Sequence, residues 1–173
     1  MLHYIYTRSF IGILTFMALA LAAWGALPAH VGARRWWCGN LVLVLLITAA
    51  ILYATLFSRA EGGTGLILAP FASLTDARQQ PELYREMLMN VFLFFPLGRT
   101  LSNALPRKWN RGGIIILTTL IGGALSAGIE YAQYRYALGL AETDDVICNT
   151  LGAFLGAASL LAAHAIEKHK ERA

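Results

Sequence analysis

The sequence predicts an all-α integral membrane protein, a helical bundle with about five transmembrane helices. Of its 173 residues, 57% are hydrophobic and only 14% are charged, and the mean hydropathy is +0.56. An average soluble domain is about one quarter charged, and one of this length leaves roughly 30% of its surface in water. The composition therefore excludes a soluble enzyme and a disordered chain. Long runs without any charged residue support this, and they cover residues 9–33, 36–58, 112–129 and 146–166.

Four spans follow from these runs. A helix that rises about 1.5 Å per residue needs about 20 apolar residues to cross the hydrocarbon of a bilayer. We therefore predict spans at residues 10–27, 40–57, 114–138 and 146–166. The first run also resembles a cleaved secretory signal, but its apolar core is longer than a typical signal, so we expect a retained helix.

A fifth span is expected at residues 87–105, although Arg99 interrupts it and Pro96 and Gly98 are expected to kink it. A half-helix or a re-entrant segment is the alternative. Together the spans predict one membrane domain over residues 1–173, with an additional helix in 1–40 and a polar tail at 166–173.

Basic residues in the connections predict the orientation. With five spans, eight lysines and arginines lie on one side of the membrane and four on the other. Because positively charged connections stay in the cytoplasm, we expect the N-terminus outside and the C-terminus inside. Cys38 and Cys148 then fall near opposite faces and should not form an intramolecular disulfide.

Most remaining polar residues gather at one depth, on the predicted outer side. They are Glu86 and Asn90 at the start of the third span, Glu130, Gln133 and Arg135 at the end of the fourth, and Asp144, Asp145 and Asn149 at the start of the fifth. Residues four apart share a helix face, so Asp145 lies on the face of Asn149. We expect these faces to converge into one pocket that opens outward. Gly152 and Gly156 continue the face of Asn149 and permit close approach of another helix.

Glu130 is the residue that a purely structural role explains least well. It lies about 12 Å below the end of its predicted helix. An acidic side chain near mid-membrane costs about 2.5–3.5 kcal/mol on insertion scales, so it should pair, become protonated or contact water. Capping of a helix is the alternative for Asp144 and Asp145, and bonding between helices is the alternative for the amides.

The connection at residues 58–85 contains an apolar segment, residues 65–71, that is too short to span the membrane. We expect it to lie in the membrane interface or to fold over the mouth of the pocket. A solvated loop with one apolar patch is the alternative.

No recognised catalytic motif is present: the chain lacks a Gly-x-Ser-x-Gly elbow, a Gly-Lys-Ser/Thr loop, His-Glu-x-x-His and Cys-x-x-Cys. The four histidines are scattered, so we expect no metal and no cofactor. The net charge of +4 is not gathered into a basic stripe with interleaved aromatics, so no nucleic-acid partner is expected. Membrane lipids are the expected partners. The chemistry favours a protein that is not an enzyme, although Glu130 and Asp145 have the groups for acid–base work.

An ordered set of motifs resembles the VanZ-like family. The set is Asn90-Val91-Phe92-Leu93-Phe94-Phe95-Pro96-Leu97-Gly98, then Glu130-x-x-Gln133, then Asp145-x-x-x-Asn149-Thr150-x-Gly152-x-x-x-Gly156, preceded by Ala69-Pro70-Phe71. The resemblance covers about residues 41–165. It implies a multi-pass protein of the bacterial cell membrane, from an accessory glycopeptide-resistance family associated with teicoplanin and without a settled reaction or cofactor. Arg135 comes sooner after Gln133 than the arginine of many members.

Two functions from different classes follow. The first is an envelope factor that binds a glycopeptide, its lipid tail or a lipid-linked wall precursor in an outer-leaflet pocket. The second is an integral-membrane enzyme that modifies a lipid or cell-wall head group with Glu130 and Asp145 as acid and base. A small transporter subunit is a third. The candidate pocket residues are Asn90, Glu130, Gln133, Arg135, Asp144, Asp145 and Asn149.

Overall fold

A computed structural model describes residues 32–57, 65–71, 81–106 and 108–170. The chain forms two compact units, Met1–Gly39 and Asn40–Ala173, and the candidate site belongs to the second. The first predicted span, at residues 10–27, lies outside the described residues.

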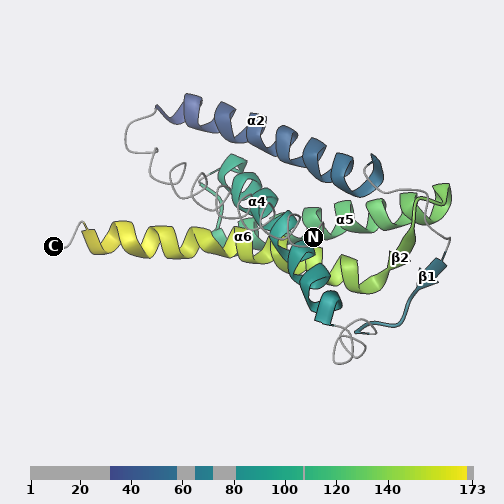
Figure 1. Cartoon of the computed structure of the whole chain (residues 1–173). Helices are drawn as coiled ribbons and strands as arrows, with labels where there is room; N and C mark the ends of the chain where they lie inside the picture. The colour runs from purple at the N-terminus through teal and green to yellow at the C-terminus, as the bar shows by residue number, and fades with distance from the viewer. Residues whose placement is uncertain (1–31, 58–64, 72–80, 107, 171–173) are drawn as a thin grey trace, which may run out of the picture. The chain divides into compact units, whose positions relative to one another are not determined.

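The described residues form four α-helices, and each covers all or most of one of the other predicted spans (Figure 1). They are α2 (Ala33–Leu52), α4 (Pro81–Ala104), α5 (Arg111–Tyr136) and α6 (Thr143–Lys170). A π-helical turn, η2 (Tyr53–Phe57), continues α2. The chain is therefore a helical protein, as its composition predicts.

Among the described residues, three stretches are long and apolar enough to cross a membrane: Arg34–Leu56, Arg111–Tyr136 and Thr143–Leu161. The prediction of about five spans is therefore not confirmed. Helix α4 has 24 residues, which is long enough. However, Asn90, Arg99 and Asn103 make it less apolar than the other three helices. That α4 crosses the membrane completely stays a prediction.

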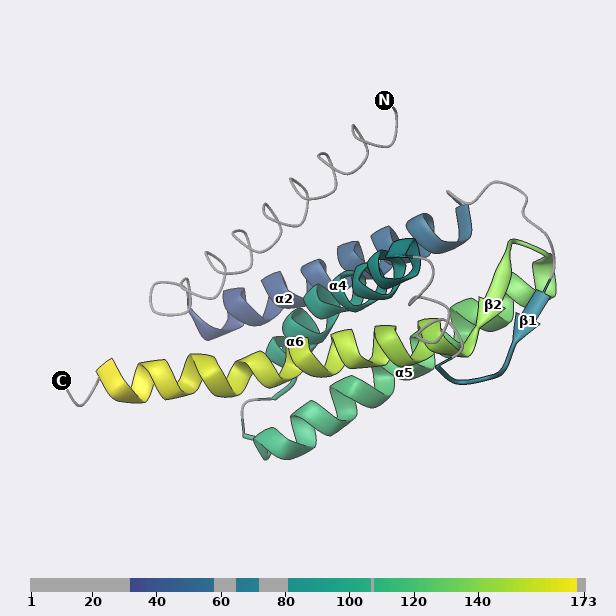
Figure 2. The same ribbon diagram turned by 60° about the horizontal axis from the view of Figure 1, so that its bottom comes forward.

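A short parallel sheet adds strand structure that the sequence did not predict. Strand β1 (Gly65–Ile67) pairs with β2 (Leu140–Glu142), with Gly65 opposite Leu140 and Ile67 opposite Glu142 (Figure 2). Strands of three residues are too short to show the alternating pattern by which a strand is recognised. The pairing joins the connection after η2 to the connection between α5 and α6.

The ends of α5 follow from local backbone chemistry. The Asn110 side chain caps the start by accepting a hydrogen bond from Gly112 N at 2.9 Å. At the other end Ala137 takes the left-handed conformation (φ 56°), and Leu138 N donates to Gln133 O. The helix thus ends two residues before the predicted span does.

Helices α4 and α6 cross in close contact because α6 carries glycine at the crossing (Figure 1). A Cβ atom at Gly152 would collide with the carbonyl of Val91, and one at Gly156 with the carbonyl of Phe95. Backbone therefore packs directly on backbone, as small residues allow between membrane helices. This confirms the close approach predicted from the spacing of Gly152 and Gly156.

The apolar core of the second unit draws on all four helices. Its fully buried members are Ile51, Phe94, Leu97, Ile129 and Ala153. Other large apolar side chains point outward, including Leu45 on α2 and Leu120 on α5. Outward-facing apolar residues of this kind suit helices that contact lipid tails rather than water.

Candidate functional site

A hydrogen bond between side chains joins α4 to α6 near the start of α6. Asn90 Nδ2 donates to Asp145 Oδ1 at 2.6 Å. The sequence predicts these two residues at one depth, and the structure brings them into direct contact. A hydrogen bond to an ionised carboxylate contributes about 1.5–3 kcal/mol. Asp145 therefore binds a neighbouring helix, a role that capping of its own helix would not explain.

One turn further along α6, a second pair joins α6 to α5. Asn149 Nδ2 donates to Ser126 Oγ at 2.9 Å, and both side chains are buried. Ser126 lies four residues before Glu130 and therefore on the same face of α5. The two pairs place the polar faces of α4, α5 and α6 against one another, as the spacing predicts.

Glu130 lies on α5 and is buried, with 8% of its surface exposed. Its Oε2 accepts a hydrogen bond from the backbone N–H of Glu142 at 2.9 Å. Glu142 is the last residue of β2, directly before α6 begins. Glu130 therefore holds the connection between α5 and α6 against α5, which is a role for a buried carboxylate that the sequence pattern does not reveal.

Gln133 is fully buried and ties α5 to the π-helical turn. Its Nε2 donates to the backbone carbonyl of Thr55 at 3.0 Å. A π-helical turn changes the local pattern of backbone hydrogen bonds and often occurs at functional sites. Because a carbonyl can only accept, this bond determines which end of the Gln133 amide is oxygen.

Two buried amides at this site have unsatisfied hydrogen-bonding groups. Gln133 Oε1 and Asn149 Oδ1 are buried, and within the described part of the chain neither has a hydrogen-bond partner. Exchanging the oxygen and nitrogen of the Asn149 amide would not remove the unpaired group. The Ser126 hydroxyl can bond to either end of the amide, and the other end would still have no partner among the described residues. A buried polar group without a partner costs about 1–3 kcal/mol, and native proteins have few of them.

The segment at residues 65–71 is bonded to the first turn of α6. Thr143 Oγ1 donates to the carbonyl of Ile67 at 3.2 Å, and Phe71 N donates to Asp144 Oδ1 at 2.5 Å. Phe71 has a positive φ of 63°, which is unusual for an aromatic residue. Three positions are expected for this segment: in the membrane interface, folded over the polar residues, or in a solvated loop. The position over the polar residues agrees best with these contacts. Its outward side chains, Leu66, Leu68 and Phe71, are exposed.

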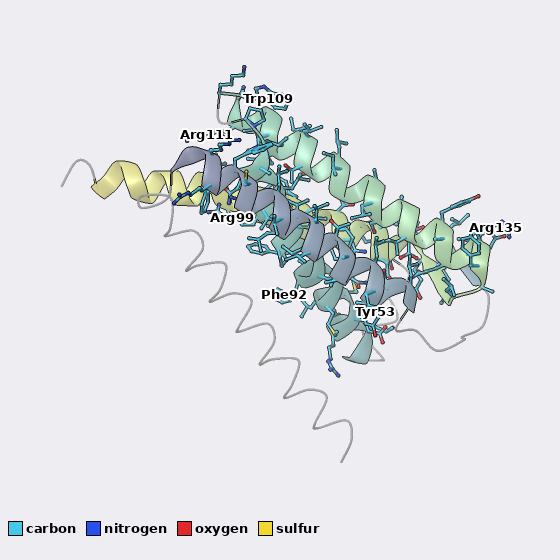
Figure 3. The ribbon with its side chains drawn as sticks, turned by 90° about the horizontal axis from the view of Figure 1, so that it is seen from above. Tyr53, Phe92, Arg99, Trp109, Arg111 and Arg135 are labelled. Atoms are coloured by element: carbon cyan, nitrogen blue, oxygen red, sulfur yellow. The ribbon has the colours of Figure 1, made fainter. Side chains whose placement is uncertain are left out.

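Arg135 and Glu86 do not join the polar group. Arg135 is exposed, and its guanidinium carbon lies 5.9 Å from the centre of the Tyr136 ring. It lies at the end of α5 that is far from Trp109 and Arg111 (Figure 3). Glu86 is also exposed. The sequence groups these residues with the site by depth, but their directions on the helices separate them from it.

The site also includes partners that sequence reasoning missed. Two are backbone groups, the carbonyl of Thr55 and the N–H of Phe71. Every residue type supplies the carbonyl, and every type except proline supplies the N–H. The one signal in the sequence is the Ala69-Pro70-Phe71 element, since a proline commonly precedes a turn. The π-helical turn has no recognisable sequence pattern.

These contacts define a polar site, which consists of Asn90, Ser126, Glu130, Gln133, Asp145 and Asn149 with the attached segment 65–71. Among the described residues, no three histidine, cysteine, aspartate or glutamate side chains are gathered closely enough to hold a metal ion. The site contains carboxylates and amide carbonyls, which accept hydrogen bonds. It is therefore suited to groups that donate hydrogen bonds, such as hydroxyls, amide N–H groups and ammonium ions.

Comparison with known proteins identifies the family. A family model described as VanZ/LLP1 matches residues 38–164, which is most of the chain and includes every residue of the polar site. No curated protein and no solved structure matches the chain. The chain belongs to the VanZ/LLP1 family.

Proposed function

We propose that this protein is a membrane-embedded binding protein whose polar site holds the head group of a glycopeptide or of a lipid-linked cell-wall component. By binding the drug or its target at the outer leaflet, it acts as an accessory factor in resistance to glycopeptides such as teicoplanin. Membership of the VanZ/LLP1 family supports the proposal, together with the arrangement of the polar site.

The observation that carries the proposal is the unsatisfied carbonyl of Gln133. Its Oε1 is buried beside the face that holds Glu130 and has no hydrogen-bond donor among the described residues. The Asn149 amide also has one unpaired end. Sugars, peptides and amines carry the hydrogen-bond donors that would satisfy such acceptors. Ligand sites commonly combine apolar walls with a few polar groups of this kind.

Exposed tyrosines support a site near the membrane surface. Tyr131, Tyr134 and Tyr136 lie at the end of α5 next to the polar site, and each has more than half of its surface exposed. Tyrosine is enriched at membrane interfaces, where its ring contacts lipid and its hydroxyl contacts water. A site at this depth is accessible to the head group of a lipid and to a drug anchored by a lipid tail.

The proposal is tested by drug susceptibility in cells that express the wild type or the variants Glu130→Gln, Asp145→Asn and Asn149→Ala at matched membrane levels. Glu86→Gln is the control, because it removes the same charge from an exposed position at the start of α4. We expect the wild type and the control to raise the inhibitory concentration of teicoplanin more than that of vancomycin. The three site variants should give the susceptibility of cells without the protein.

Absence of protection by a correctly inserted wild type would refute the resistance role. Equal protection by the site variants would refute the role of the polar site. Loss of protection with retained drug binding in Glu130→Gln would instead favour the alternative, a membrane enzyme that uses Glu130 and Asp145 as acid and base. Loss of both favours a binding protein.

A further inference from the structure

Arg99 is a cationic residue in the interior of α4, and no acidic side chain among the described residues is bonded to it. Its Nη1 donates to Ser159 Oγ of α6 at 3.3 Å, and within the described part of the chain its side chain has no other polar contact. Ser159 Oγ in turn donates to the carbonyl of Gly156 at 2.6 Å. A guanidinium has five N–H groups, so this single neutral contact leaves most of them without an acceptor.

A second unpaired donor lies one turn away on the same helix. Asn103 Nδ2 is buried and has no hydrogen-bond partner among the residues that the structure describes. Asn103 is four residues after Arg99, and residues at this spacing lie about 5–6 Å apart on one face of a helix. The side chains of Arg99 and Asn103 therefore place hydrogen-bond donors next to each other, and neither side chain contains a carboxylate.

Arg99 also lies apart from the acidic residues of the polar site. The described acidic residues of α5, β2 and the start of α6 belong to the end that carries the polar site. Arg99, Trp109 and Arg111 lie toward the opposite end from Arg135 (Figure 3). Arg99 follows Asn90 by nine residues, or about 13 Å along α4, so its surroundings are distinct from the polar site.

Arg99 lies close enough to the end of α4 for its guanidinium to reach a lipid head group. It lies five residues before Ala104, the last residue of α4, which is about 8 Å along the helix axis. Trp109 follows in the connection to α5 and is 46% exposed, as is typical of tryptophan at a membrane interface. A long arginine side chain at this depth extends its charged group toward the interface.

We propose that Arg99 and Asn103 form a binding site for the phosphate of an anionic membrane phospholipid, between α4 and α6. The planar guanidinium donates two parallel hydrogen bonds to phosphate oxygens, and the amide of Asn103 donates a third. On the predicted orientation this lipid belongs to the cytoplasmic leaflet. The site is independent of the proposed function, because it shares no side chain with the polar site.

The test uses the full-length protein, purified and placed in lipid nanodiscs made of phosphatidylcholine alone or mixed with phosphatidylglycerol. Native mass spectrometry measures which lipid remains bound, and the unfolding temperature is recorded in parallel. Arg99→Gln and Asn103→Leu remove the two donors. Arg111→Gln is the control, because it removes one positive charge from an exposed position at the same end. Inorganic phosphate added to the phosphatidylcholine sample distinguishes a free anion from a lipid.

We expect the wild type and Arg111→Gln to retain phosphatidylglycerol in preference to phosphatidylcholine. Arg99→Gln should weaken this preference about tenfold, as for the loss of a charge-assisted hydrogen bond. Asn103→Leu should weaken it to a smaller extent while leaving the fold intact. Equal preference in the wild type and both variants, or no preference in the wild type, would overturn the proposal. Stabilisation by inorganic phosphate alone would overturn its assignment to a lipid.

Discussion

Single buried residues in this protein connect elements that are far apart in the sequence. Gln133 connects α5 to the π-helical turn, and Glu130 connects α5 to the backbone of Glu142. In an apolar surrounding each of these bonds matters more than it would at a water-exposed surface, since an unpaired group has no water to bind. The bonds therefore hold the helix ends and, at the same time, position the groups that we propose contact a ligand.

The pair of Asn90 and Asp145 provides a test at this scale. Asn90→Leu should lower the free energy of unfolding by about 1–3 kcal/mol, because it leaves the Asp145 carboxylate without this donor. The double variant Asn90→Leu with Asp145→Leu should lose less than the sum of the two single variants. Reversible unfolding in mixed micelles measures all three. Additive losses would mean that the two side chains do not interact, and Glu86→Gln serves as an exposed control.

At the scale of elements, the crossing of α4 and α6 sets the geometry of the site. Gly98 of α4 contacts the backbone of Ala153, while Gly152 and Gly156 of α6 contact the backbone of α4. Any side chain at these positions would separate the two helices. Separation would also break the contact between Asn90 and Asp145, because that bond spans the same two helices.

Gly152→Ala tests this dependence. We expect a loss of stability larger than about 1 kcal/mol, because the new Cβ would collide with a backbone carbonyl that cannot move alone. Gly128→Ala is the matched control on α5, since a Cβ there would meet no atom within 4 Å. The control should gain about 0.5–1 kcal/mol from the higher helix propensity of alanine. Similar unfolding temperatures for the two variants would contradict the close crossing.

At the scale of the whole molecule, membrane orientation connects both proposals. The polar site lies at one end of the bundle and Arg99 toward the other, so the two proposed ligands belong to opposite leaflets if α4 crosses the membrane. In the part of the chain that the structure describes, three stretches qualify as spans by length and hydropathy, and α4 is the helix on which the predicted topology depends.

Reporter fusions at the C-terminus test the predicted topology. The excess of basic residues on one side predicts a cytoplasmic C-terminus, so a fused green fluorescent protein should fluoresce and a fused alkaline phosphatase should be inactive. A phosphatase fused after residue 110, in the connection between α4 and α5, should also be inactive. If α4 does not cross while α2 keeps its orientation, residue 110 and the C-terminus move to the outer side together, because two spans lie between them. Activity of the phosphatase at both positions would therefore contradict the predicted crossing of α4.

Sequence alone determined the class of the protein and the depth of its polar groups. Charge-free runs locate helices because a bilayer requires a fixed length of apolar chain, and four-residue spacing assigns residues to faces because the helix repeat is regular. For these reasons the faces of Asp145 with Asn149 and of Gly152 with Gly156 could be predicted. The directions of Arg135 and Glu86 away from the site could not, because spacing gives no absolute rotation of a helix.

Tertiary structure alone decided which partner each polar group has. Glu130 and Gln133 bind backbone atoms of a strand and of a π-helical turn, and backbone atoms have no signature in the sequence. The short strands form only because residues 65–67 meet residues 140–142 across a long separation in the chain. The unpaired groups of Gln133, Asn149 and Asn103 likewise depend on how the helices pack. Contacts between distant segments therefore gather polar residues into two candidate binding sites, one toward each end of the bundle.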